Sequence, residues 1–323
     1  MAQISVGDYL DAWLAHVKGR VRQRTHEGYE ALIRIHAKPA IGEIGLADLR
    51  PLDLQELYSS VLARRSAGTV VNLHLVLTQA LSQAVRWGYV AVNAASGAQP
   101  PRPQRKELTV LDQAGVEAIL AAAEGTRMEA PVAIAIATGM RRGEVLGLRW
   151  SDMDPDFLTA RVSRSLQRSS CQTRMEAPKT ARSRRAVVLP AMLRPHLERQ
   201  RADQDRRRVV AGDGWEETKI VVDYANGRPW RATSFPTAFA KFLREAGLPH
   251  VRFHDLRHAH ATLMLSKGVH PKIVSERLGH ASIGITLDTY SHVPPSMQQD
   301  AADAFDEIFM PTGGLVPDHA ATE

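Results

Sequence analysis

Apolar residues recur at intervals of three and four positions along the first part of the chain. The first such set consists of Tyr9, Leu10, Trp13, Leu14 and Val17. Residues with this spacing lie on one face of an α-helix, where they can pack against a core. The same spacing recurs in residues 69–87, and a proline in a favourable first-turn position opens another helix in residues 50–57. The pattern predicts an all-helical module over residues 1–93.

The helical pattern is interrupted at residues 94–108, which contain three prolines, small residues and basic side chains. This composition predicts a linker, which could either lie along a phosphate backbone or serve as a solvated hinge. Helical spacing resumes in residues 112–123 and 131–137, and short β-type stretches follow in residues 159–163 and 185–189. The chain beyond the linker is therefore predicted to mix helices with short strands.

Together these patterns predict a mainly α-helical protein with a small β-sheet. We expect a helical domain over residues 1–93, a linker over residues 94–108, an α+β domain over residues 109–310 and a flexible tail over residues 311–323. A chain of 323 residues is long enough for two domains of roughly 100–200 residues each. Hydrophobic residues make up 44% of the sequence and charged residues 24%, which is typical of a globular protein that buries a core.

The charge balance of the chain favours an anionic partner. The formal net charge is +6 and the pI is about 9.6, and basic residues greatly outnumber acidic ones in residues 161–208, which we expect to form the nucleic-acid face. The longest apolar stretch, residues 131–137, is far shorter than the roughly 20 residues of a membrane-spanning helix. Residues 1–10 do not resemble a secretory signal, and the single Cys171 cannot form an internal disulfide. We therefore expect a cytoplasmic protein.

One cluster of polar residues combines a cation with two imidazoles. His254, Arg257 and His258 lie at helical spacings of three and four, so they share one face. Such a face favours an anion or a metal ion, and two histidines four residues apart imitate half of a zinc site. No glutamate follows the first histidine, however, and Arg257 would repel a divalent cation. The spacing thus favours an anion, with a zinc-dependent hydrolase as a remote alternative.

Two further clusters suit phosphate chemistry. In residues 137–150, glycines flank Arg141 at the start of a predicted helix, where backbone N–H groups and the positive helix end attract phosphate. His280 stands ten residues before Tyr290. A tyrosine hydroxyl, with an ordinary pKa of about 10, needs nearby cations and a proton acceptor before it can act as a nucleophile. The other clusters could provide both.

In their order along the chain, these motifs resemble those of the tyrosine recombinase family, also called phage-type integrases. The matching segments are Thr-Gly-Met-Arg-Arg-Gly-Glu at 138–144, His-Asp-Leu-Arg-His at 254–258, Leu-Gly-His at 278–280 and Thr-Tyr at 289–290. The resemblance covers nearly the whole chain and implies a SAM-like core-binding domain joined by a basic linker to a catalytic domain. Because helical sequence begins near residue 6, we expect no separate arm-binding domain before it.

The resemblance implies roles for individual residues. Tyr290 would attack a DNA backbone phosphate and form a 3′-phosphotyrosyl link, while Arg141 and Arg257 would hold the non-bridging oxygens. His254 would exchange the proton of the tyrosine, and His280 would form a hydrogen bond to the phosphate.

Further residues are implied to assist this centre. Lys179, in a predicted β-hairpin turn, would protonate the departing oxygen, and Glu144 would support the first arginine. His258 and His260 are expected to be supporting or packed imidazoles. We expect DNA contacts from basic side chains of the linker and of the turn, namely Arg102, Arg105, Lys106, Arg182 and Arg184.

The implied chemistry uses neither a metal ion nor another cofactor, because the phosphotyrosyl link conserves the energy of the phosphodiester bond. The sequence contains no phosphate-binding loop of the P-loop type. The implied partners are double-stranded DNA recombination sites and further copies of the chain in a tetramer, and the resemblance also allows for a directionality factor.

The function implied is that of a site-specific recombinase that integrates or excises a mobile element. The same chemistry would serve chromosome or plasmid dimer resolution, and type IB topoisomerases use a similar tyrosine only to relax supercoils. A DNA-binding regulator with a degenerate site would bind DNA without cutting it. The presence of a full set of catalytic residue types favours an enzyme over a regulator.

Overall fold

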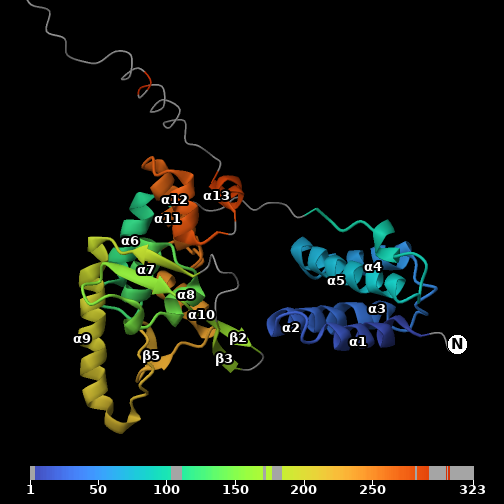
Figure 1. The fold of residues 1–323 in the computed structure, drawn as a ribbon, viewed down its shortest axis with the longest axis horizontal. Helices are drawn as coiled ribbons and strands as arrows, with labels where there is room; N and C mark the ends of the chain where they lie inside the picture. Colours follow the sequence, from blue (N-terminus) through green and yellow to red (C-terminus); the bar gives the residue numbers. More distant parts are fainter. Residues whose placement is uncertain are drawn as a thin grey trace, which may run out of the picture. The chain divides into compact units, whose positions relative to one another are not determined.

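The computed structural model describes residues 4–102, 111–169, 172–176, 184–280 and 282–290, together with Asp303 and Phe305. Its contacts divide the chain into two compact units. The first consists of Met1–Leu108 together with Ser169–Gln172, and the second consists of Thr109–Arg168 and Thr173–Glu323. Both units are labelled by element in Figure 1. No helix in the described ranges is long and apolar enough to cross a membrane.

From residue 4 to residue 102, the first unit consists of helices and their connections, with one isolated β-bridge between Ser5 and Gly45. The helices are α1 (Val6–Val17), α2 (Gln23–Leu32), the π-helix η1 (Ile33–Ala37), α3 (Lys38–Ile41), α4 (Pro51–Leu62), α5 (Ala67–Arg86) and the 3₁₀-helix η2 (Ala94–Gly97). The side chain of Ser5 caps α1, and the side chain of Ser66 caps α5. The predicted apolar face of α1 is buried, and the Tyr9 hydroxyl donates to the carbonyl oxygen of Ala80 on α5 over 2.6 Å. The sequence pattern therefore predicted α1, α4 and α5, and it predicted the inner face of α1.

The packed structure of this unit extends beyond residue 93, where the sequence pattern predicted the linker to begin. Residues 94–97 form η2, and Ala95 is buried. Asn93 fixes this turn, because its side chain accepts from the backbone N–H of Ala95 and donates to the carbonyl oxygen of Thr78. Small residues fit against α4 and α5 here without an apolar period, so the pattern did not reveal the packing.

The second unit mixes helices with short strands. Its helices are α6 (Gln113–Ala123), α7 (Glu129–Thr138), α8 (Arg142–Gly147), η3 (Trp150–Asp152), η5 (Ala191–Leu193), α9 (Arg194–Ala211), η6 (Gly212–Gly214), α10 (Ser234–Glu245), α11 (Asp255–Ser266), α12 (Pro271–Leu278) and α13 (Ile283–Tyr290). The strands beyond residue 109 are β1 (Thr159–Val162), β2 (Ser165–Ser169), β3 (Gln172–Glu176), β4 (Arg185–Val188), β5 (Asp223–Ala225) and β6 (Arg228–Pro229). In the described residues they pair as β1–β4, β2–β3 and β5–β6. The mainly helical fold with small β-sheets is as predicted.

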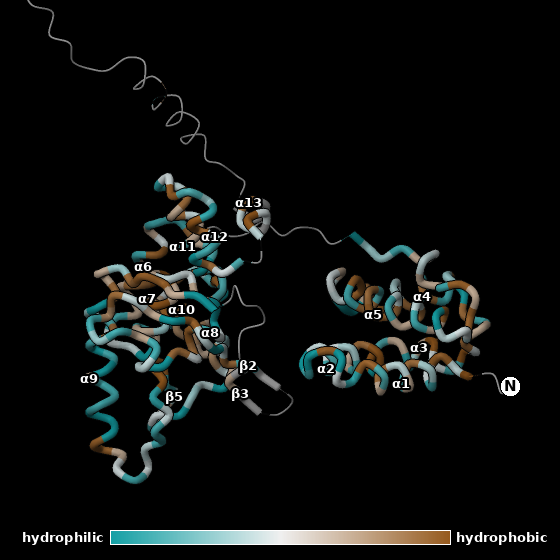
Figure 2. Tube along the Cα trace, in the orientation of Figure 1, coloured by the Kyte–Doolittle hydropathy of each residue, from teal (hydrophilic) through white to brown (hydrophobic). Residues whose placement is uncertain are grey.

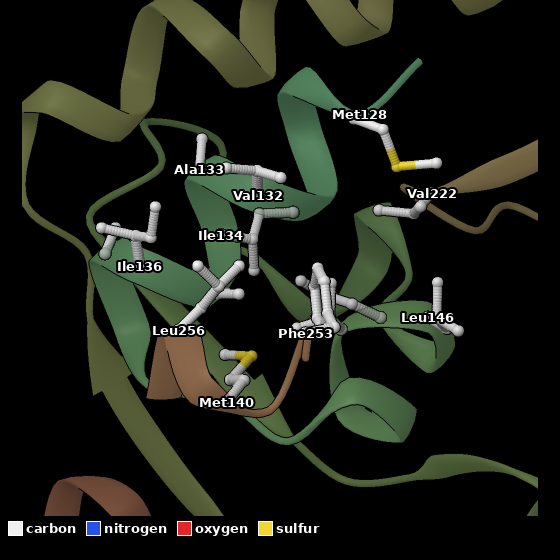
Figure 3. Packing of buried hydrophobic residues seen from close by; sticks show 14 of the residues in the cluster. Met128, Val132, Ala133, Ile134, Ile136, Met140, Leu146, Val222, Phe253 and Leu256 are labelled. Atoms are coloured by element: carbon white, nitrogen blue, oxygen red, sulfur yellow. The ribbon is translucent and has the colours of Figure 1, made fainter. Parts of the chain in front are cut away.

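Helix α7 is the centre of this unit. Every one of its residues is buried, as expected for a helix that is apolar on all sides. It packs against α6, α9 and α11, and Figure 3 shows Ile134 and Ile136 of α7 in one cluster with Leu256 of α11. Figure 2 shows the contrast with α9, which is hydrophilic along most of its length. Because α7 is packed on all sides, its end holds the residues that follow it in a fixed position.

The β1–β4 pair sets the position of Arg185. The two strands are antiparallel, with Val162 opposite Arg185 and Thr159 opposite Val188. Ala160, Val162 and Val187 point into the core. The two predicted β-type stretches are thus confirmed, and their register places the Arg185 side chain where it can meet α8 and α12.

Candidate active site

The turn between α7 and α8 sets the position of Arg141. Gly139 ends α7 in the left-handed conformation, with φ of 64°, and Arg141 is then the extended N-cap residue of α8. The backbone N–H of Arg141 donates to Glu144 Oε2 and its Nη1 donates to Oε1, each over 2.9 Å. Its Nη2 donates to the carbonyl oxygen of Gly279, also over 2.9 Å. The side chain is held from two directions and is 37% exposed, so it can still reach a ligand.

Glu144 lies between two arginines and is almost fully buried. Its Oε2 accepts a hydrogen bond of 2.9 Å from Nη2 of Arg185 on β4, and only 4% of its side chain is exposed. Burial opposes ionisation of this carboxyl group, but Arg185 and Arg141 outweigh it, so the pKa of Glu144 lies below its ordinary value. The ionised carboxylate therefore fixes both guanidinium groups.

Arg257 is attached to the same turn as Arg141. It lies on α11 with 3% of its surface exposed, and its Nη1 donates to the carbonyl oxygen of Gly139 over 2.7 Å. Gly139 precedes Arg141 by two residues. One short backbone segment thus fixes the spacing between two arginines that are far apart in the sequence.

His254 and His258 lie at the start of α11. Their rings meet edge to face, with centroids 4.9 Å apart. The carboxylate of Asp255 accepts from the backbone N–H of Arg252 over 2.7 Å, which fixes the beginning of the helix. Burial, and then the charges of His258 and Arg257, lower the pKa of His254. A neutral imidazole here has a ring nitrogen that can accept a proton.

His280 connects the Gly279 turn to α13. Gly279 takes a left-handed conformation with φ of 68°, and Nδ1 of His280 lies 2.8 Å from Oγ1 of Thr286, which is fully buried on α13. Burial, followed by the charges of Arg257 and Arg141, lowers the pKa of His280 to about 4. Its imidazole is therefore neutral at pH 7.

These predicted side chains share one electrostatic neighbourhood, because the charges of both arginines and of His258 act on His254 and on His280. Its members are Arg141, Glu144, His254, Arg257, His258 and His280. Tyr290 is the last residue of α13, and the predicted DNA contacts Arg102 and Arg184 are exposed. Other predicted residues lie outside the part of the chain that the structure describes, namely Lys179, Arg105, Lys106 and Arg182.

Sequence analysis gave no role to Arg185 or Arg277, both of which are part of the network around this centre. Arg185 Nε donates to the carbonyl oxygen of Arg277 over 2.6 Å, and Arg277 Nε donates to Nε2 of His260 over 3.2 Å. In the sequence, only their positions could have indicated a role: Arg277 directly precedes the Leu-Gly-His motif, and Arg185 opens a β-type stretch. Arginines in such places are usually solvated, so adjacency alone does not identify them.

Part of the basic segment of residues 161–208 has partners inside the protein. On α9, Arg199 Nε donates to Glu129 over 2.7 Å, and Arg207 pairs with Asp223 over 2.6 Å. Both carboxylates are buried, so these arginines neutralise internal charges. This part of the basic segment supports the fold.

The chemical character of the site is that of an anion site. Within the described ranges, no group of three or more His, Cys, Asp or Glu side chains could hold a metal ion. The clustered groups are guanidiniums with fixed directions and imidazoles of lowered pKa. Planar guanidiniums form paired, charge-assisted hydrogen bonds to phosphate oxygens, which a compact ammonium group cannot do as well.

Comparisons with known proteins agree with this character. The model of the phage integrase family matches residues 109–297, and that of the phage integrase N-terminal SAM-like domain matches residues 5–62. The chain is 29% identical to a tyrosine recombinase XerC-like protein of Caldanaerobacter subterraneus, over 95% of this chain and 84% of that protein. It is 30% identical to an integrase of Streptomyces ambofaciens, over 94% of this chain and 80% of that protein.

A similar fold occurs in the Tn1549 transposon integrase in complex with transposon right end DNA. That structure has a TM-score of 0.80 and 21% sequence identity, and the alignment covers 94% of this chain and 99% of that chain. The likeness therefore includes the folds of both units.

Proposed function

Because the chain belongs to the phage integrase family of tyrosine recombinases, we propose that it is a site-specific DNA recombinase with Tyr290 as its nucleophile. The observation that carries this proposal is the attachment of Arg141 and Arg257 to one turn. Arg141 keeps part of its guanidinium exposed while Glu144 and Gly279 fix its direction. Such a centre is preorganised for a phosphate whose charge increases in the transition state.

In this proposal, Arg141 and Arg257 hold the non-bridging oxygens of the scissile phosphate. His280 donates a further hydrogen bond to it. If the hydroxyl of Thr286 donates to Nδ1 of His280, the proton of the neutral ring lies on Nε2, which is then the donor to phosphate. The lowered pKa of His280 supports a neutral donor.

The cleavage step exchanges one phosphate ester for another. The Tyr290 hydroxyl oxygen bonds to phosphorus while the bond from phosphorus to the 5′ oxygen breaks. The tyrosine proton passes to His254, and Lys179 gives a proton to the departing oxygen. The products are a 3′-phosphotyrosyl link and a free 5′-hydroxyl, and the 5′-hydroxyl of a partner strand reverses the step without a nucleotide cofactor.

We propose integration or excision of a mobile element as the biological task, as the name of the Streptomyces ambofaciens relative suggests. The XerC-like relative supports dimer resolution as the alternative. Exchange between two duplexes requires four cut strands and one Tyr290 for each, which argues for a tetramer on DNA. A directionality factor is a further proposed partner, and the cytoplasm is the proposed compartment.

The division of labour along the chain is also a proposal. Residues 1–93 would bind the core DNA site, residues 94–108 would link, residues 109–310 would carry out catalysis, and residues 311–323 would form a flexible tail. The match of residues 5–62 to a SAM-like domain model supports the first assignment. The exposure of Arg102 and Arg184 is compatible with phosphate contacts, and Arg105, Lys106 and Arg182 are proposed to act with them.

The first prediction concerns covalent DNA adducts. The full-length protein, incubated in EDTA with DNA from its source and then denatured, should retain DNA ends that cluster at one sequence. Tyr290→Phe should abolish these adducts, because it removes the only proposed nucleophile. Sequencing the attached ends would measure both the yield and the site.

The matched control is Tyr224→Phe, which alters an exposed tyrosine of the same unit and should leave the yield unchanged. Adducts that persist in Tyr290→Phe would exclude Tyr290 as the nucleophile. Selective DNA binding without any adduct would favour the DNA-binding regulator, and complete loss of cleavage in EDTA would refute metal-free chemistry.

A further inference from the structure

The C-terminal end of α7 is closed by three side chains from α11 and α12. The last carbonyl groups of a helix have no partner within the helix. Here the carbonyl oxygen of Ile136 accepts from Nδ1 of His260 over 2.7 Å, and that of Ala137 accepts from Nη2 of Arg277 over 2.9 Å. Two residues after Ala137, the carbonyl oxygen of Gly139 accepts a hydrogen bond from Arg257.

His260 and Arg277 form a directional pair. Nδ1 of His260 faces a carbonyl oxygen, so it carries the ring proton, and Nε2 accepts from Nε of Arg277 over 3.2 Å. A second ring proton would lie on Nε2 of His260, so that this N–H group would face the Nε–H group of Arg277. Only 7% of His260 is exposed, and its burial, with a smaller effect of Arg277, lowers its pKa to about 4.

Arg277 also contacts both ends of β4. Its Nη1 donates to the carbonyl oxygen of Val188 at the end of β4 over 2.9 Å. Its own carbonyl oxygen accepts from Arg185, which also binds Glu144. All three of its nitrogens bond to protein acceptors, which indicates that its planar fork orients neighbours and does not itself bind a ligand.

The pair lies directly against the turn that carries Arg141. A Cβ atom at Gly139 would lie 2.6 Å from Cδ2 of His260 and 2.5 Å from Cδ2 of Leu278. Arg277 is followed by Leu278 and Gly279, and the carbonyl oxygen of Gly279 orients Arg141. A shift of Arg277 would therefore disturb the contact of Arg141 with Gly279. Through Arg185, it would also disturb the contact of Arg141 with Glu144.

We propose that the Arg277–His260 pair is a positioning device for the phosphate site. It fixes the end of α7 and the Gly279 turn relative to each other, and through them the directions of Arg141, Arg257 and His280. This inference rests on the proposed recombinase function. A displacement of reacting groups by about 1 Å is enough to slow a reaction by roughly 100-fold, so loss of the pair should act mainly on the chemical step.

The test measures single-turnover adduct formation by the full-length protein on DNA that contains its cleavage site. Arg277→Lys keeps the charge but loses the planar fork, and His260→Phe keeps a ring of similar size but loses both hydrogen bonds. Each variant should form the adduct about 10- to 100-fold more slowly, with DNA affinity within about twofold of that of the wild type. The double variant should be no slower than the slower single variant, because the two residues act as a unit.

The matched control is Arg207→Lys. Arg207 also joins several elements, through Asp223 and Asp203, but on the α9 side of the unit. It should lose stability and final adduct yield while the rate constant of the folded fraction stays unchanged. If Arg277→Lys or His260→Phe behaves in that way, the pair has only a structural role. If their effects on the rate multiply in the double variant, the two residues act independently and do not form one positioning device. Absence of adducts in the wild type would instead refute the recombinase function on which this proposal rests.

Discussion

At the scale of residues, this chain uses one local motif with two different consequences. Arg50 with Asp53, and Arg141 with Glu144, are both arginine N-caps whose backbone N–H donates to a carboxylate three residues later. In the first pair the Arg50 side chain is 70% exposed and the Asp53 side chain 13%, whereas in the second the Glu144 side chain is only 4% exposed and also binds the buried Arg185. A buried carboxylate between two cations is costly to disturb, and an exposed pair contributes little.

We therefore expect Glu144→Gln to lower the free energy of unfolding by about 3 kcal/mol, because it leaves the buried Arg185 without its counter-charge. Asp53→Asn should cause a much smaller loss. Urea-dependent hydrogen exchange, read separately for each unit by mass spectrometry, would measure both. Equal losses would mean that burial and the second arginine add nothing to this motif.

At the scale of elements, the apolar pattern predicted helices such as α1, α5 and α6, in which burial follows a regular face. Helix α9 has no such face, because only Leu197 and Gln204 are buried along it, and its arginines pair with carboxylates of other elements. The end of α7 shows what the apolar pattern cannot predict even where it predicts the helix itself. The sequence predicts the helix, but the reason for a glycine at 139 lies in α11 and α12.

Two glycines of the same unit separate backbone strain from close packing. Gly125 and Gly139 have φ of 70° and 64°, but a Cβ atom at Gly125 would meet nothing within 4 Å. Gly125→Ala should cost only the left-handed strain of about 1 kcal/mol. Gly139→Ala should cost clearly more and should slow adduct formation, because it displaces His260 and Leu278.

Urea denaturation and single-turnover cleavage of both variants would measure these effects. Similar stability losses together with unchanged cleavage rates would show that the neighbours of Gly139 adjust freely, which the contact geometry argues against.

At the scale of the whole molecule, the second unit concentrates histidines of lowered pKa. Burial is the largest cause for His254, His258, His260 and His280 alike. The unfolded chain binds protons at these groups near pH 6.5, while the folded protein resists binding them until about pH 4 at His260 and His280. Stability is therefore fully present above pH 6.5 and is lost as the pH falls toward 4.

The buried His260 alone should remove about 2 kcal/mol of stability between pH 7 and pH 5. Urea unfolding at constant ionic strength over this range should reveal the loss, and carboxylates with lowered pKa such as Glu144 stay ionised there. His260→Phe, which removes one titration, should flatten the dependence. Stability that stays constant or rises on acidification would contradict the assignment of a neutral His260.

The sequence by itself determined the helical faces, the two β-type stretches, the order of the motifs and hence the family. These features depend on neighbouring residues, and a helix or strand repeats its spacing over a few positions. Residues such as His254, Arg257 and His258 could therefore be grouped before their surroundings were known.

Only the tertiary structure decided how the arginines are held. Arg141 meets Gly279 across 138 positions, Arg257 meets Gly139 across 118, and Arg185 meets the carbonyl oxygen of Arg277 across 92. In each contact the acceptor is a backbone carbonyl, which every residue carries, so it leaves no mark in the sequence. The positioning role proposed for Arg277 and His260 becomes visible only once the end of α7, the end of β4 and the Gly279 turn are seen to meet.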